Sequence, residues 1–166
     1  MIHHIQAYSK TKHYGRALNQ AISYYPDNCW LIIRDFDTMP FDGYHEILEQ
    51  AIKDNPDCRF FTCWTNRAYG LPMDRETNIL NHWRNAQGRK KRYTELKGVV
   101  PAFFWMIHKS LWTERPFDDH PIIWHGKSFD ARWTKHMDEK KIRIDHLYIF
   151  HFYRLNKSHG DYGHLK

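Results

Sequence analysis

Residues 31–37 read Leu-Ile-Ile-Arg-Asp-Phe-Asp, an apolar run that ends in two aspartates separated by one residue. The run follows a turn-forming Pro-Asp-Asn sequence at 26–28, so residues 29–33 favour a buried strand over a helix. In open α/β sheets, ligands bind beyond the carboxyl ends of strands, and residues i and i+2 of an extended chain project to the same side. We therefore expect Asp35 and Asp37 to face one ligand, with a divalent cation that carries a phosphate offsetting their repulsion. Alternatively, both aspartates simply end the strand and cap the next element of the chain.

Length and composition favour one folded domain. The chain has 166 residues, of which 42% are hydrophobic and 16% aromatic, which excludes a disordered protein. No run approaches the roughly 18 apolar residues of a membrane span. The segment from Met1 to His4 lacks the basic and apolar regions of a signal peptide. We therefore expect a cytoplasmic protein without a membrane span.

The cysteines indicate the state of the thiols, and the net charge indicates the class of partner. Cys29, Cys58 and Cys63 form no Cys-x-x-Cys pair, so we expect core thiols rather than disulfides or a thiolate metal site. The net charge of +6 favours anionic partners such as nucleotides, phospholipid surfaces or nucleic acid.

Hydrophobic periodicity predicts alternating strands and helices. Apolar residues at helical spacing predict helices at 14–22, 44–55 and 130–140, with shorter helices at 75–84 and from Ser110. Strands are predicted at 2–8, 29–33, 59–64, 99–107, 142–144 and 148–154. Between them, residues 68–97 form a long excursion that contains the basic run 89–92, and residues 156–166 form a polar tail.

The order of these pieces resembles a small glycosyltransferase of the GT-A fold, similar to family 2. The matching segments are 15–19, 30–37, 61–67, 98–108, 117–119 and 151–154. The resemblance implies a single α/β domain over residues 1–155, with a Rossmann-like, mixed and mostly parallel sheet flanked by helices. Compared with the family, the amino-terminal half before Asp35 is truncated.

The resemblance also implies a reaction and a metal. A sugar would pass from a UDP- or GDP-sugar to a hydroxyl of a glycan, a lipid or a nucleic acid, with Mn²⁺ or Mg²⁺ bound by Asp35, Asp37 and His151. An imidazole beside carboxylates favours Mn²⁺. Alternatively, His151 is only a strand-end residue.

Donor-binding residues implied by the same resemblance lie in the first part of the chain. They are Tyr8, Arg16, Asn19, Arg34 and Asp35, and core packing is the alternative for Tyr8.

Catalytic and acceptor residues are assigned in the same way. Asp130 stands near the position of the family's general base, with Asp119 as the second choice. The expected displacement inverts the configuration at the anomeric carbon of the sugar. Asp130 could instead be an acid that stabilises a helix start.

The acceptor is expected to contact Trp64, Asn66 and Arg67. Residues 68–97 would form a lid hinged at Gly70 and Gly88. The alternative for this segment is a solvated surface loop.

Two rival functions are compatible with the same residues. The Asp35-x-Asp37 pattern also resembles the nucleophile loop of haloacid-dehalogenase phosphatases, although Arg34 and Met39 depart from that family's pattern. A nucleic-acid-binding module would account for the basic run at 89–92 and the abundant aromatic residues.

Overall fold

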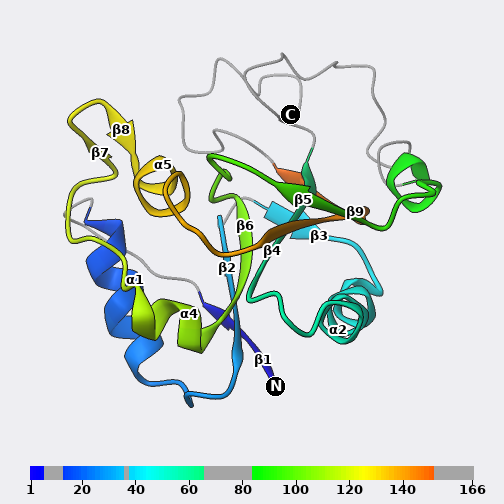
Figure 1. The fold of residues 1–166 in the computed structure, drawn as a ribbon, viewed down its shortest axis with the longest axis horizontal. Helices are drawn as coiled ribbons and strands as arrows, with labels where there is room; N and C mark the ends of the chain where they lie inside the picture. Colours follow the sequence, from blue (N-terminus) through cyan, green and yellow to red (C-terminus); the bar gives the residue numbers. More distant parts are fainter. Residues whose placement is uncertain (6–12, 36–37, 66–83, 152–166) are drawn as a thin grey trace, which may run out of the picture.

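One mixed α/β domain is built around a seven-stranded sheet (Figure 1). The computed structural model describes residues 1–5, 13–35, 38–65 and 84–151. Six strands pair in the order β1 (Ile2–Ile5), β2 (Trp30–Arg34), β6 (Phe104–His108), β4 (Phe60–Thr65), β9 (Lys141–His151) and β3 (Thr38–Pro40). A seventh strand, β5 (Tyr93–Leu96), also pairs with β9.

The strand directions correct one prediction. The β1–β2 and β4–β9 pairs are parallel, whereas β6 is antiparallel to both β2 and β4, and β3 and β5 are antiparallel to β9. The expectation of a mixed sheet flanked by helices is confirmed, but the expectation of a mostly parallel sheet is wrong. The reason is that β6 lies between β2 and β4, which both run in the opposite direction. The short strands β3 and β5 also pair with β9 in the antiparallel direction.

Helices cover both faces of the sheet (Figure 1). Helices α1 (Tyr14–Ser23), α4 (Lys109–Glu114) and α5 (Phe129–Thr134) share one core cluster, and α2 (Tyr44–Asp54) belongs to another. Alternation along β2 explains the division, because Leu31 and Ile33 join the first cluster and Ile32 joins the second.

The three thiols are buried, as predicted, and form no disulfide. None of the helices in the described ranges is long and apolar enough to cross a membrane.

Helix α5 is shorter than predicted. It ends at Thr134, although Phe129, Trp133 and Met137 are all buried in one cluster at helical spacing. A turn replaces the expected last part of the helix, with the Met137 amide donating to the Thr134 carbonyl at 3.4 Å. The spacing therefore correctly identified core residues but overestimated the helix that carries them.

The predicted excursion at 68–97 is partly wrong. Residues 84–87 are helical, and β5 pairs with β9 through the register Tyr93–Ile144 to Leu96–Lys141, so residues 84–97 include parts of the fold rather than a lid alone. The strand β5 was not predicted because its sequence, Tyr-Thr-Glu-Leu, is polar. The rest of the proposed lid, residues 68–83, lies outside the described ranges, as does the tail at 156–166.

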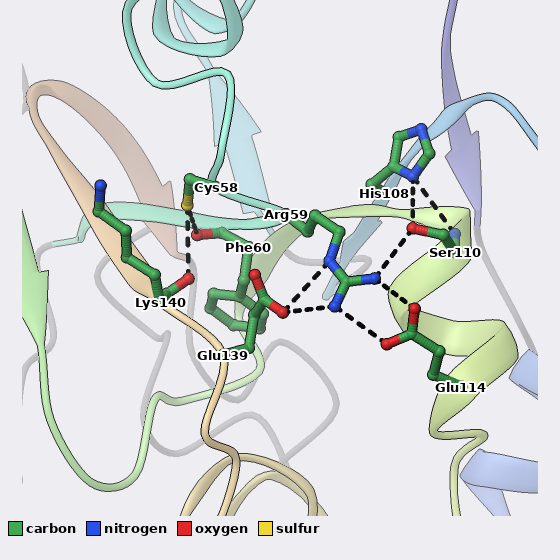
Figure 2. Close-up of polar contacts among 8 residues, drawn as sticks. All are labelled: Cys58, Arg59, Phe60, His108, Ser110, Glu114, Glu139 and Lys140. Carbon is green, nitrogen blue, oxygen red and sulfur yellow. Dashed lines mark hydrogen bonds and ion pairs between the residues drawn. The ribbon is translucent and has the colours of Figure 1, made fainter.

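Arg59 fastens the start of β4 to two neighbouring elements (Figure 2). Its guanidinium donates to Glu114 of α4 at 2.6 Å and to Glu139, just before β9, at 2.7 Å. The Ser110 hydroxyl accepts a further bond from Arg59 at 3.2 Å. Strand β4 is thereby tied to α4 and to the start of β9.

Asp145 is a carboxylate buried inside β9, with 3% of its surface exposed. It accepts hydrogen bonds from Trp64 Nε1 at 3.0 Å, from Arg143 Nε at 2.7 Å and from the Thr94 hydroxyl. Burial acts to raise the pKa of Asp145, but the hydrogen bonds outweigh burial and lower it below the usual aspartate range. The carboxylate thus joins β4, β5 and β9.

We predict that Asp145→Asn lowers the free energy of unfolding by about 2 kcal/mol at neutral pH. The N–H group of the Asn side chain would face neighbouring groups that are themselves hydrogen-bond donors. In the native chain, the contribution of Asp145 is complete above the ordinary aspartate pKa and is lost as pH falls through the lowered folded-state pKa. Urea unfolding from about pH 5 to about pH 2 should therefore show a shallower pH dependence for the variant. The exposed Asp138→Asn is the control. Equal stability of both variants would contradict this role.

Candidate functional site

Asp35 directly follows β2 and starts a tight turn toward β3. Its amide donates to the Phe103 carbonyl at 3.1 Å, and its carbonyl accepts from the Thr38 hydroxyl at 2.6 Å. Arg34 Nη1 donates to the Thr38 carbonyl at 2.6 Å, which holds the other side of the turn. Asp35 is therefore fixed by its backbone, while 38% of its side chain remains exposed.

His151 ends β9 and faces this turn. It pairs in register with Thr38 of β3, and its ring stacks on Phe103 with an interplanar angle of 26°. His151 Nε2 lies 3.5 Å from Asp35 Oδ2. The structure thus brings together two of the three predicted metal ligands, from the carboxyl ends of two strands that are not neighbours in the sheet.

The spacing of these two atoms fits a shared cation. The two atoms lie close enough together for one cation to contact both side chains. Of the two predicted ions, an imidazole ligand favours Mn²⁺ over Mg²⁺. Within the described ranges, no group of three His, Cys, Asp or Glu residues is placed to hold a metal. The third predicted ligand, Asp37, lies outside those ranges.

Tyr14 is a neighbour of Asp35 that sequence reasoning missed. It begins α1, and burial together with the Asp35 carboxylate raises the pKa of its phenol well above the ordinary range. Its ring contacts Phe129 edge-on, with centroids 5.4 Å apart. Packing between α1 and α5 thus holds a neutral hydroxyl within electrostatic range of the Asp35 carboxylate.

Arg16 and Asp119, predicted for donor binding and catalysis, pair with each other. Arg16 Nε donates to both carboxylate oxygens of Asp119, at 2.8 and 2.9 Å. The hydrogen bond from Arg16 is the main cause of a lowered pKa for Asp119. A carboxylate held in this way is a poor proton acceptor, so the geometry argues against Asp119 as the general base.

Asn19, predicted to bind the donor, forms hydrogen bonds within the fold. Its Nδ2 donates to the Phe117 carbonyl at 2.8 Å, and its Oδ1 accepts from the Phe117 amide and from Trp112 Nε1. The side chain thereby joins α1 to α4 and to the segment after α4.

Asp130 occupies the first turn of α5. Its Oδ1 accepts a hydrogen bond from the Ala131 amide at 2.8 Å, which is the helix-start alternative foreseen from the sequence. Its Oδ2 makes no hydrogen bond within the described ranges.

Trp64, predicted to contact the acceptor, is held by cations. The Arg143 and Arg89 guanidinium carbons lie 3.8 and 3.9 Å from its ring centroid, and its indole donates to Asp145. These contacts give Trp64 a structural role at the β4–β9 junction. The predicted residues Tyr8, Asn66 and Arg67 lie outside the described ranges.

Arg132 organises the loop beside α1, a role that periodicity did not indicate. It pairs with both oxygens of Asp118 at 2.9 Å and donates to the carbonyls of Pro121 and Lys127. These bonds anchor the hairpin of β7 (Ile123–Trp124) and β8 (Lys127–Ser128).

Comparisons of this chain with protein-family models, with characterised proteins and with solved structures found no match.

Gly15 sets the distance between α1 and the loop at Asp118. A Cβ added at Gly15 would lie 2.0 Å from the Asp118 carbonyl oxygen, so the backbone of one element would have to move.

We predict that Gly15→Ala lowers the free energy of unfolding by about 1–3 kcal/mol, despite the better helix propensity of alanine. Gly88→Ala is the matched control, because its Cβ would meet only ordinary contacts, the nearest at 3.5 Å. Thermal unfolding of both variants tests the prediction, and an unchanged or higher midpoint for Gly15→Ala would contradict the close approach.

Proposed function

We propose that this protein is a metal-dependent glycosyltransferase of the GT-A type. It would move a sugar from a UDP- or GDP-sugar to an acceptor hydroxyl. The observation that carries the proposal is the 3.5 Å approach of Asp35 Oδ2 and His151 Nε2 at the carboxyl ends of β2 and β9. The order of the chain segments that resemble family 2 adds to it.

The carboxylate and the imidazole would hold the cation, together with Asp37. When bound, Mn²⁺ or Mg²⁺ offsets the charge that develops on the departing diphosphate. The turn bonds fix the backbone of Asp35, and stacking on Phe103 orients the His151 ring, which reduces the conformational freedom lost on binding.

Proton transfer is assigned to Asp130 in this proposal. The acceptor oxygen attacks the anomeric carbon, the bond from that carbon to the diphosphate breaks, and the hydroxyl proton passes to Asp130. The Ala131 amide donates a hydrogen bond to Oδ1, and Oδ2 would accept the proton. Asp119 is the weaker candidate because Arg16 occupies both of its oxygens.

The acceptor could be a glycan, a lipid or a nucleic acid. Residues 90–92 of the basic run are exposed, which suits a polyanionic acceptor, whereas Arg89 is committed to Trp64.

We expect His151→Ala to abolish Mn²⁺-dependent binding of UDP and GDP while the fold is retained, because one of the ligands is lost. Calorimetric titration of each nucleotide with and without Mn²⁺ measures this. The exposed His136→Ala controls for removal of an imidazole elsewhere. Unchanged Mn²⁺-dependent binding in His151→Ala would refute the metal assignment.

Asp130→Asn should reduce sugar transfer by on the order of 10²- to 10⁴-fold, the usual contribution of positioned proton transfer, while nucleotide binding persists. Donor turnover with a panel of nucleotide sugars and acceptors provides the readout. If Asp119→Asn alone loses activity, the base is misassigned. Hydrolysis of a generic aryl phosphate that depends on Asp35, without any sugar transfer, would favour the phosphatase alternative instead.

A further inference from the structure

Two imidazoles meet on the side of the molecule where β1 packs near α2. His4 of β1 and His45 of α2 place their Nε2 atoms 3.4 Å apart, with the two rings nearly perpendicular at 78°. Both side chains are exposed. The Tyr44 hydroxyl lies 2.8 Å from the same His4 nitrogen. The proposed transfer reaction uses none of these groups.

The separation of the two nitrogens suits a shared ion better than a direct hydrogen bond. Hydrogen bonds donated by N–H groups are usually about 2.9–3.0 Å long, so a gap of 3.4 Å is loose. Two imidazole ligands at about 2.0–2.1 Å from a tetrahedral Zn²⁺ have nitrogens roughly 3.4 Å apart. The rings are therefore already spaced for one ion.

We propose that His4 and His45 form a second metal site, which binds a divalent transition-metal ion such as Zn²⁺ and clamps β1 to α2. Water would complete the coordination, and the ion would replace the hydrogen bond between the Tyr44 hydroxyl and His4 Nε2. The site is separate from the Asp35–His151 pair and does not depend on the proposed transferase function.

The charges around His4 and His45 include some that favour and some that oppose binding of a cation. Partial burial, followed by His45 and Arg34, lowers the pKa of His4, which keeps its imidazole neutral and able to ligate at neutral pH. The positive charge of Arg34 opposes a bound cation. Asp42 and Glu46, both exposed, are the acidic residues nearest to His45 in the sequence. With two protein ligands, the site should bind more weakly than a closed structural zinc site, which has four.

The test is a Zn²⁺ titration of the full chain without nucleotide, followed by calorimetry and by the thermal unfolding midpoint. The native chain should bind Zn²⁺ and unfold at a higher temperature as Zn²⁺ is added, because the ion binds only where β1 and α2 are together. His45→Gln should weaken binding at least tenfold and abolish the rise in midpoint. His136→Gln, which removes another exposed imidazole, should leave both unchanged.

Each alternative outcome refutes the proposal. Native-like Zn²⁺ binding by His45→Gln would show that this pair is not the site, and equal losses in His136→Gln would indicate scattered surface binding. Loss of binding in His151→Ala, but not in His45→Gln, would move the Zn²⁺ to the Asp35 site. His45→Gln alters only an exposed helix residue, so circular dichroism of the metal-free variant should match that of the native chain.

Discussion

Residues Phe103 and Phe104, at the entry to β6, are the contact on which the rest of the structure depends. The Phe103 carbonyl accepts the amide of Asp35 at 3.1 Å, and the Phe104 carbonyl accepts the hydroxyl of Thr62 on β4 at 2.8 Å. The ring of Phe103 also stacks on His151. The same two residues therefore connect the strand of the aspartate, the central strand β4 and the strand of the histidine.

Chain length explains why these groups meet. From Arg34 in β2 to Thr38 in β3, four residues can span at most about 14 Å. Between these strands the sheet contains β6, β4 and β9, and four strand spacings in a flat sheet would require about 19 Å. The sheet must therefore curl, which brings the end of β9 toward the end of β2. A short connection thus produces the approach of Asp35 to His151.

Sequence patterns predicted the elements whose signal is local. Helix α1, helix α2 and strand β2 were predicted within one or two residues, because their apolar spacing matches their burial. The antiparallel direction of β6 and the pairing of β5 depend on partners distant in the chain, which periodicity does not encode. For the candidate site, the strand-end position indicated Asp35, and the family resemblance indicated His151. The partners of Asn19 and Arg16 were not predicted, because Phe117 and Asp119 lie about a hundred residues away in the sequence.

Paramagnetic broadening of backbone amide signals by Mn²⁺, in the presence of UDP or GDP, tests the central claim most directly. Mn²⁺ shortens the relaxation times only of nuclei close to it, so the broadened signals show where the ion binds without any change to the chain. The account predicts selective broadening at Arg34, Asp35, Thr38, Phe103 and His151. Broadening centred elsewhere, or no selective broadening with either nucleotide, would contradict a metal site between the ends of β2 and β9.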